Sequence, residues 1–360
     1  MLPRQLDSLV FWSEAELAEL QASTVVNKIG KAGAEEMFSN HLVPLGFDTN
    51  TCHRVASTIM AYAFDIPEDE QSKEGLEKEG EDDLVSDNGE DEKTILSMIP
   101  LADMLNADAH RNNARLICDN AELEMRAIKP ISKGEEIFND YGQLPRSDLL
   151  RRYGYVTDNY APFDVAELGT QSILAAFTNN TFHTINPSLT PLSQQQLKQR
   201  TELAEREGIY EESYDILHTT PDEPGISDEL LALLYLLLVD EETLASIINS
   251  QSTIPSRSKL STELVGQVLA TLLRARESEY KSTAEEDEAI NGMNLPHRTR
   301  MALQVRLGEK KVLRQAILEA SQFRGSDKRM RIAQDVAENV GNSKRRMDDE
   351  TTDSRKKRLR

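Results

Sequence analysis

Apolar residues follow a helical spacing through the first part of the chain, residues 1–66. Ser13 and Glu16 have the pattern of a capping box, in which the Ser13 hydroxyl accepts from the Glu16 amide and the Glu16 carboxylate accepts from the Ser13 amide. A second helix is predicted over about residues 53–64, because apolar residues recur there every three or four positions. Its apolar stripe consists of Val55, Ile59, Met60 and Ala63. The pattern therefore predicts a helical region up to residue 66.

The periodicity changes in residues 94–165, where short runs show partial alternation of apolar and polar residues. The runs at 114–118 and 122–128 read as two strands, and the Asp-Asn pair at 119–120 reads as the hairpin turn between them. A further strand is predicted at 136–139, after punctuation by proline and glycine. We predict a small antiparallel β unit here.

Helical periodicity returns after residue 166 and continues to about residue 325. A leucine-rich run after a cap at Ser227 or Asp228 predicts one helix, and two further apolar stripes predict two more. The stripes consist of Leu230, Leu231, Leu234, Leu237 and Leu238; of Leu264, Val265, Val268, Leu269, Leu272 and Leu273; and of Val305, Val312, Leu313, Ala316 and Ile317. Such stripes usually pack helices together, so we interpret this region as helical core and not as a cofactor site.

Two regions lack any apolar period and are charged with opposite sign. Residues 67–93 are dominated by aspartate and glutamate, and we expect a disordered acidic loop because nothing in it can be buried. The basic tail, residues 326–360, carries positive clusters at 344–346 and 355–360, which resemble a bipartite nuclear import signal. We therefore expect the protein in the nucleus, with the cytoplasm as a further compartment.

Composition restricts the partners and the chemistry. The chain has 360 residues, enough for two or three compact units, and a net charge of −21. An acidic protein repels nucleic acid and attracts basic polypeptides, so we expect a basic protein partner and no specific nucleic-acid partner. The two cysteines, Cys52 and Cys118, form neither a disulfide framework nor a zinc motif, and we expect no metal. The longest apolar run, 230–239, is too short to cross a bilayer, so no membrane partner is expected.

Three short motifs carry the functional information, in a fixed order within about fifty residues. The first is Ala-Asp-Met-Leu-Asn at 102–106, the second is Gly-Glu-Glu-Ile-Phe-Asn-Asp-Tyr-Gly at 134–142, and the third is Leu-Leu-Arg-Arg-Tyr-Gly-Tyr at 149–155. A lone Tyr-Gly pair after a strand carries little information, since tyrosine on a strand is usually core. All three motifs with their spacing resemble the C-terminal half of a SET domain.

The resemblance extends over roughly residues 8–325 and implies the architecture. Phe-Trp-Ser-Glu-Ala-Glu-Leu at 11–17 resembles the start of the helical insertion that the Rubisco-methyltransferase-like branch places inside its SET domain. Residues 94–165 would then be the C-terminal half of the SET domain, and residues 166–325 the helical substrate-binding domain of that branch. The implied fold class is α+β: a partial SET β-fold with a helical insertion, followed by an all-α substrate-binding domain.

The resemblance also implies the chemistry, which is methyl transfer from S-adenosyl-L-methionine to a lysine side chain of a basic protein. Tyr141 matches the catalytic tyrosine that closes the active site of this family. Asn106 matches the asparagine that holds the cofactor, Ala107 offers a backbone contact where many members carry histidine, and Tyr153 matches an aromatic residue near the cofactor. The version Ala-Asp-Met-Leu-Asn-Ala-Asp resembles the fungal ribosomal-protein lysine methyltransferases, which implies a ribosomal protein as the substrate.

One expected motif is absent. SET domains begin with strands that carry a Gly-x-Gly turn for the cofactor, and no such turn followed by strands precedes the helical insertion at residues 1–66. We therefore expect the N-terminal part of the SET domain to be missing from this chain, through truncation or loss. The alternative function is a catalytically inactive, truncated SET scaffold that binds a protein partner.

Overall fold

The computed structural model describes residues 6–67, 94–119, 122–187, 189–220 and 223–330. The predicted acidic loop, the Asn120 position of the predicted turn and most of the predicted basic tail lie outside these residues. The chain divides into two compact units. Unit 1 comprises residues 1–20, 25–164 and 294–305, and unit 2 comprises residues 21–24, 165–293 and 306–360. None of the helices in the described ranges is long and apolar enough to cross a membrane.

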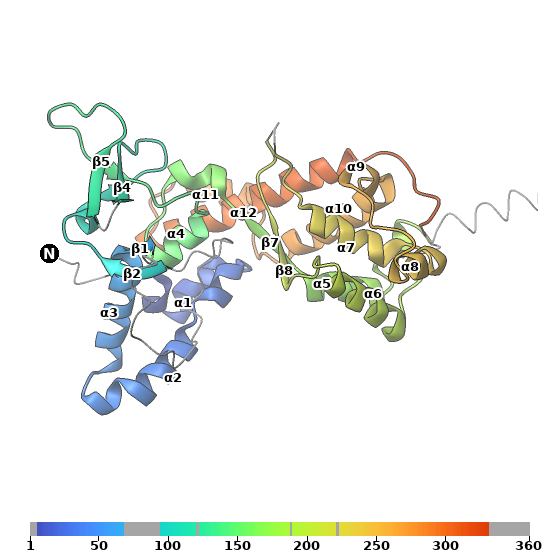
Figure 1. Cartoon of the computed structure of the whole chain (residues 1–360), viewed down its shortest axis with the longest axis horizontal. Helices are drawn as coiled ribbons and strands as arrows, with labels where there is room; N and C mark the ends of the chain where they lie inside the picture. The colour runs from blue at the N-terminus through green and yellow to red at the C-terminus, as the bar shows by residue number, and fades with distance from the viewer. Residues whose placement is uncertain (1–5, 68–93, 120–121, 188, 221–222, 331–360) are drawn as a thin grey trace, which may run out of the picture. The chain divides into compact units, whose positions relative to one another are not determined.

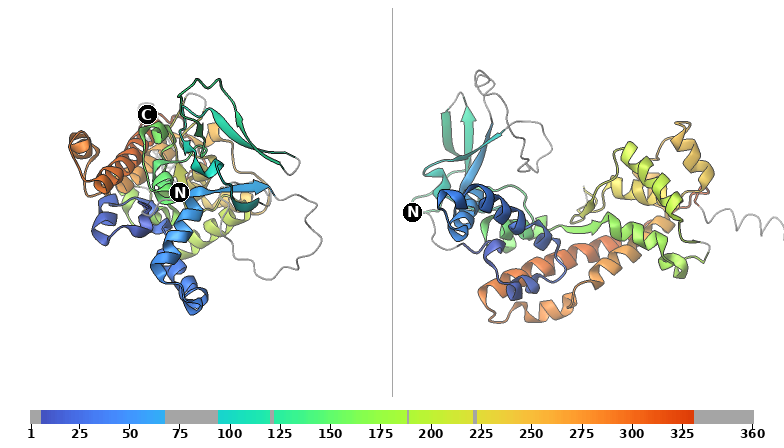
Figure 2. Two further views of the ribbon diagram at one scale, coloured as in Figure 1. Left: turned by 90° about the vertical axis from the view of Figure 1, so that its left-hand side faces the viewer. Right: turned by 90° about the horizontal axis from the view of Figure 1, so that it is seen from below.

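Unit 1 begins with short helical segments and a longer helical hairpin, drawn in blue (Figure 1 and both views of Figure 2). The helices are η1 (Leu9–Phe11), α1 (Glu14–Leu17), η2 (Ala18–Leu20), η3 (Thr24–Lys28), α2 (Lys31–His41), η4 (Val43–Leu45) and α3 (Thr49–Tyr62). The capping box at Ser13 is confirmed, since its hydroxyl accepts from Glu16 and the Glu16 carboxylate accepts from the Ser13 amide. The predicted second helix corresponds to α3, which begins earlier because the Asp48 side chain caps it by accepting from the Thr51 amide.

The predicted apolar stripe of α3 does not face a core. Val55 is 49% exposed, Ile59 38% and Met60 49%. The helix instead buries a mixed face that consists of Cys52, His53, Ser57, Thr58 and Ala61. On that face His53 meets the edge of the Phe38 ring from α2, with ring centroids 5.0 Å apart, and its Nε2 lies 3.1 Å from Glu35 Oε1. The periodicity predicted the helix correctly, but the apolar stripe is not the face that the helix buries.

Within the described residues, the β part of unit 1 consists of three separate strand pairs. The strands are β1 (Ala63–Pro67), β2 (Thr94–Met98), β3 (Asn106–Ala107), β4 (Ala114–Asp119), β5 (Glu122–Ala127) and β6 (Phe138–Asn139), with η6 (Ala102–Met104) before β3. The β4–β5 hairpin is confirmed as antiparallel, and β1 pairs with β2 in the same sense. The prediction of a purely antiparallel unit was wrong, because β3 and β6 pair in parallel and β6 is only two residues long. Parallel neighbours require a crossover, which the chain supplies through the β4–β5 hairpin.

The remainder of unit 1 holds α4 (Arg146–Tyr153) and η7 (Asp158–Phe163). Helix α4 is anchored by Leu149 and Leu150, whose side chains are fully buried. Leu150 belongs to a small apolar cluster with Leu9, Trp12, Leu20, Val25, Met301, Ala302 and Val305. The guanidinium of Arg146, at the start of α4, donates to Asp164 at 2.6 Å and to Asp158 at 3.0 Å. These contacts hold the helix that carries Tyr153.

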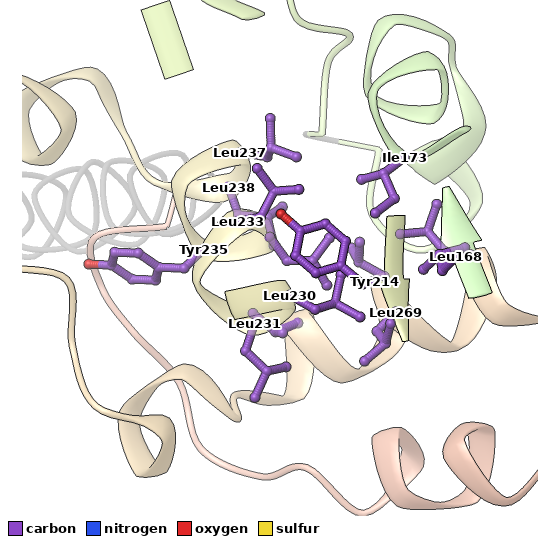
Figure 3. Close-up of a cluster of buried hydrophobic side chains, with 14 of the residues drawn as sticks. Leu168, Ile173, Tyr214, Leu230, Leu231, Leu233, Tyr235, Leu237, Leu238 and Leu269 are labelled. Carbon is purple, nitrogen blue, oxygen red and sulfur yellow. The ribbon is translucent and has the colours of Figure 1, made fainter. Parts of the chain in front are cut away.

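Unit 2 is mostly helical, as predicted, and also contains a short antiparallel pair of strands. Its elements are β7 (Ala166–Gly169), α5 (Thr170–Thr178), η8 (Thr181–Thr184), α6 (Gln194–Arg206), β8 (Ser213–Ile216), α7 (Asp228–Leu238), α8 (Glu241–Ile248), α9 (Arg257–Leu260), α10 (Glu263–Ser278), α11 (Ala284–Asn291) and the later part of α12 (His297–Ser321). Ser227 caps α7 by accepting from the Leu230 amide, which confirms one of the two predicted caps. Helix α7 belongs to the large apolar core, and Leu168, Ile173, Tyr214 and Leu269 lie along one side of it (Figure 3).

Candidate active site

Two of the three sequence motifs meet in the β3–β6 strand pair of unit 1. Asn106 lies opposite Phe138, and Ala107 lies opposite Asn139. The Asp108 amide extends the pairing by donating to the Asn139 carbonyl at 3.1 Å. The predicted cofactor-binding residues are thereby placed beside the strand that leads into Tyr141.

Asn113 holds β6 in place through both of its polar ends. Its side-chain oxygen accepts from the Phe138 amide at 2.9 Å, and its side-chain nitrogen donates to the Glu136 carbonyl at 2.9 Å. Its own amide donates to the Phe138 carbonyl at 3.1 Å. A two-residue strand has few ladder bonds, so a buried asparagine that bridges it supplies much of its fixation. Asn113 lies outside the three motifs, and its signal in the sequence is the run of Asn and Asp residues after Asn106.

A tight turn carries the chain from β6 through Tyr141. Gly142 has a φ of +82°, a left-handed conformation that glycine adopts without strain. Asp140 stabilises the turn, since its carboxylate accepts from the Gly142 amide at 3.0 Å and from the Asn112 side chain at 3.2 Å. The Tyr-Gly pair of the second motif is thus a turn that fixes where the tyrosine ring leaves the backbone.

The third motif brings Tyr153 against Tyr141. The two rings are stacked, with centroids 4.1 Å apart and planes only 4° from parallel. Tyr155 meets the Tyr153 ring edge-on at 6.5 Å. Helix α4 ends at Gly154, whose φ of +74° closes the helix between the two tyrosines. Three tyrosines that are separate in the sequence therefore form one aromatic cluster.

The cluster keeps its hydroxyls protonated. Burial raises the pKa of Tyr141 far above its ordinary value, and the neighbouring hydroxyls of Tyr153, Tyr62 and Tyr160 raise it further. Burial likewise raises the pKa of Tyr155, and it raises the pKa of Tyr160 to about 12. At neutral pH these groups are neutral phenols, which can both donate and accept hydrogen bonds.

Two hydroxyls are buried without a hydrogen-bond partner among the described residues, that of Tyr155 in the cluster and that of Tyr160 beside it. Tyr160 is fully buried, and its hydroxyl is near the Tyr141 amide without reaching hydrogen-bonding geometry. A buried hydroxyl without a partner is costly, and such groups often mark where a ligand binds. Tyr155 ends the third motif without an assigned role, and Tyr160 lies outside the three motifs.

Asn106 stands at the edge of this arrangement. Its side chain is exposed, and its amide nitrogen donates to Glu136 Oε1 at 2.7 Å. The backbone of Asn106 pairs with the strand that leads into the Tyr141 turn, whereas its side chain is hydrogen-bonded to the loop before β6. Ala107 is partly exposed and offers only backbone groups.

Among the described residues, the motif residues belong neither to a metal-binding cluster nor to the cavity found in unit 2. Within the described ranges, no cluster of three histidine, cysteine, aspartate or glutamate side chains is suited to hold a metal ion. A cavity of about 360 Å³ lies in unit 2, along α10 and the end of α12, and none of the motif residues line it.

Comparison with known proteins identifies both units. Residues 11–142 match the model of the SET domain, and residues 191–313 match the model named Rubisco LSMT substrate-binding. The chain therefore combines a match to the SET domain with a match to the Rubisco LSMT substrate-binding domain. This finding confirms the family resemblance and the α+β architecture that the sequence predicted.

Relatives and solved structures agree with this assignment. The ribosomal lysine N-methyltransferase 4 of Saccharomyces cerevisiae is 36% identical over 195 residues, which cover 51% of this chain and 38% of the relative. The human actin-histidine N-methyltransferase is 29% identical over 244 residues, 64% of this chain and 37% of the relative. The chain thus spans well under half the length of these relatives. The crystal structure of the SET domain of LSMT bound to lysine and AdoHcy has a TM-score of 0.60 at 17% identity, and the match covers 89% of this chain and 69% of that one.

Proposed function

We propose that this SET-domain protein transfers a methyl group from S-adenosyl-L-methionine to a lysine side chain of a basic protein, with Tyr141 as the catalytic residue. The observation that carries the proposal is the stacked Tyr141–Tyr153 pair beside the β3–β6 strands. The names of relatives support the reaction type: one is a ribosomal lysine N-methyltransferase, and the matched LSMT structure holds lysine and AdoHcy.

The aromatic cluster suits a lysine acceptor. A lysine amine has an ordinary pKa of about 10.4 and must lose its proton before it can attack a methyl group. Burial in an apolar pocket disfavours the ammonium ion and so lowers that pKa. The phenol of Tyr141 is neutral, so it holds the amine by hydrogen bonding without adding a negative charge that would stabilise the ammonium ion.

The residues present also fit the cofactor. S-adenosyl-L-methionine supplies an electrophilic methyl group on its sulfonium sulfur. We assign its binding to Asn106, Ala107 and Tyr153. Asn106 offers an exposed side-chain amide, which donates to Glu136 here, and Ala107 offers the backbone groups of a two-residue strand. The unpartnered Tyr155 and Tyr160 hydroxyls provide acceptors for a cationic ligand at the same cluster. Holding both reactants in line supplies much of the rate, and no metal is required.

The substrate is proposed to be a ribosomal protein, on the strength of the name of the S. cerevisiae relative. A net charge of −21 favours a basic partner of this kind, and raised salt should weaken its binding. The actin-histidine relative indicates that histidine is the other acceptor to test. We propose the nucleus as the main compartment because of the basic clusters at 344–346 and 355–360, with the cytoplasm as a further one.

The second candidate is an inactive scaffold that binds a protein partner. Unit 2 has a much larger apolar core than unit 1, so it can serve as a stable binding module even where no methyl transfer takes place. Calorimetry with S-adenosyl-L-methionine separates the two functions. Heat of binding supports the methyltransferase, and absence of heat supports the scaffold.

The decisive experiment replaces Tyr141 by phenylalanine. We expect Tyr141→Phe to lower kcat on the order of 100-fold, because an oriented hydroxyl is lost at the reacting atoms, while the Kd for S-adenosyl-L-methionine changes little. Tyr235→Phe is the control, since it removes the same hydroxyl group from a buried tyrosine of unit 2, away from the motif residues. Transfer of radiolabelled methyl groups to a ribosomal protein fraction measures the turnover of the two variants. Equal turnover in the two variants would remove Tyr141 from the reaction.

A further inference from the structure

Asp108 is a buried carboxylate that directly follows the strand carrying Asn106 and Ala107. Its side chain is 5% exposed. It ends the Ala-Asp-Met-Leu-Asn-Ala-Asp motif, without a role assigned from the sequence. Its Oδ1 atom accepts from the His110 amide at 3.0 Å and from the Arg111 amide at 2.9 Å. These two bonds form a turn that ends β3, and they leave the second oxygen free for longer-range contacts.

The second oxygen connects β3 to η7. Asp108 Oδ2 accepts from the Asn159 side chain at 2.8 Å. Asn159 is the neighbour of Tyr160, the fully buried tyrosine next to the Tyr141 turn. The backbone of Asp108 makes a further contact, because its amide donates to the carbonyl of Asn139, two residues before Tyr141. One residue therefore touches the strand of Asn106, the segment of Tyr160 and the strand leading to Tyr141.

The same oxygen also controls the position of Arg111. The guanidinium of Arg111 donates to Asp108 Oδ2 at 2.8 Å and lies over the Phe138 ring, 4.5 Å from its centroid. Phe138 is the β6 residue opposite Asn106. Charge-assisted hydrogen bonds of this kind are stronger than neutral ones. The Asp108 carboxylate therefore also holds Phe138 of β6, through Arg111.

The carboxylate remains ionised in this place. Burial alone would raise the pKa of Asp108, but the hydrogen bonds from Arg111 and His110 outweigh it, and the pKa lies below its ordinary value. Asp108 thus acts as a constant negative charge at neutral pH and not as a proton donor.

We propose that Asp108 is the positioning residue of the active site, which sets the cofactor-binding strand β3 and the Tyr141 turn against η7. The inference rests on the proposed function, since it assigns Asp108 a role in the same site. Asp108 acts through Asn106, Asn139 and Tyr160 and does not touch the reactants. Misplacement of a reacting group by about 1 Å can cost 100-fold in rate, so a residue with this role must affect both cofactor binding and turnover.

The first variant is Asp108→Asn. Its amide oxygen still accepts from His110 and Arg111, so the turn survives, but its NH2 group now faces the Asn159 and Arg111 donors. We expect the KM for S-adenosyl-L-methionine to rise about tenfold and kcat to fall roughly 10- to 100-fold, with the KM for the protein substrate unchanged. Asp287→Asn is the control, because it also replaces a buried carboxylate that binds two cations, in unit 2. That control lowers the fraction of folded protein without changing either KM.

A second variant tests rescue. Asp108→Asn combined with Asn159→Asp exchanges the two groups across their hydrogen bond, so that the amide nitrogen at position 108 donates to a carboxylate at position 159. We expect this pair to recover most of the lost cofactor affinity. The proposal would be overturned if the activity of Asp108→Asn fell only in proportion to the fraction of folded protein. Unchanged KM and kcat in Asp108→Asn would overturn it as well.

Hydrogen exchange followed by mass spectrometry separates this inference from the proposed function. In the full chain without ligand, Asp108→Asn should speed amide exchange together in 106–113, 138–142 and 158–163, while Asp287→Asn should speed none of them. If the wild-type chain binds no S-adenosyl-L-methionine, the proposed function fails, and exchange still decides whether Asp108 couples the three segments. Exchange confined to 106–113 would refute the coupling.

Discussion

The two units bury their apolar side chains to very different extents. In unit 2, every residue of α7 from Leu230 to Leu238 is buried (Figure 3). These residues belong to one large cluster to which α5, α6, α8, α9, α10 and α12 also contribute. Unit 1 has a helix of similar length, α3, that leaves Val55, Ile59 and Met60 exposed. Among the exposed large apolar side chains of the described residues, all but Leu217, Met293 and Leu318 belong to unit 1.

The contrast shows where stability and chemistry lie. Each buried leucine contributes about 1.5–3 kcal/mol, so unit 2 obtains its stability from a conventional core. The tyrosine site of unit 1 depends instead on two-residue strands, an asparagine bridge and stacked rings. Segments with little buried apolar area open most easily, so the proposed site is built on the less stable half of the protein.

The largest effect is expected from the buried ion cluster of unit 2. Asp287 is fully buried and binds Arg306 at 3.0 Å and Lys310 at 2.6 Å. Asp287→Asn leaves two buried cations short of a partner and should cost about 3–5 kcal/mol in the free energy of unfolding. Asp164→Asn in unit 1 should cost less, because Arg146 keeps its contact with Asp158. Urea unfolding measures both variants, and a larger loss for Asp164→Asn would reverse the comparison.

One glycine in each unit tests how closely the chain is packed there. A Cβ atom on Gly266 would lie 2.2 Å from the Ala320 carbonyl in unit 2, and one on Gly154 would lie 2.7 Å from the Ser8 amide in unit 1. We expect Gly266→Ala and Gly154→Ala each to cost about 1–3 kcal/mol. Only Gly154→Ala should also lower methyl transfer, because it displaces Tyr153. Gly33→Ala is the control, since its Cβ meets nothing within 4 Å; it should be neutral or stabilising in thermal unfolding.

Acid should weaken unit 2 through Asp287. Burial would raise the pKa of this carboxyl, but hydrogen bonds from Arg306 and Lys310 outweigh burial and lower the pKa. A lowered pKa means that the stabilising contribution is present above the unfolded value of about 3.8 and is lost as the pH falls through the lower folded value. Denaturation curves between pH 5 and pH 2 should show this loss in the wild type and not in Asp287→Asn. Parallel curves for the two proteins would contradict it.

The smallest effect is expected on the exposed stripe of unit 1. Replacing Val55, Ile59 and Met60 by glutamine should change the free energy of unfolding by no more than about 0.5 kcal/mol each, because the side chains are already in contact with water. Leu234→Ala in the core of unit 2 provides the contrast, with a loss of about 2–5 kcal/mol. A large loss from the stripe variants would show that this face is covered in solution.

Sequence reasoning succeeded where one short stretch contains the whole cause of a structure. The Ser13 capping box, the 114–128 hairpin and the Ser227 cap all depend on neighbours within a few positions, and all three are present. The motifs identified the SET family because their residue types and spacing are unusual together. The exposed stripe of α3 marks the limit of such reasoning, since periodicity reveals that a helix has an apolar face but not whether anything packs against it.

The sequence by itself determined the family, the helical and β regions, and Tyr141, Asn106, Ala107 and Tyr153 as candidate site residues. Only the tertiary structure decided that β3 and β6 run parallel, that Tyr141 stacks on Tyr153, and that Asp108 joins the segments around them. The physical reason is range. Caps and turns are set by hydrogen bonds between near neighbours, whereas strand pairing, ring stacking and a buried carboxylate depend on residues that only the fold brings together.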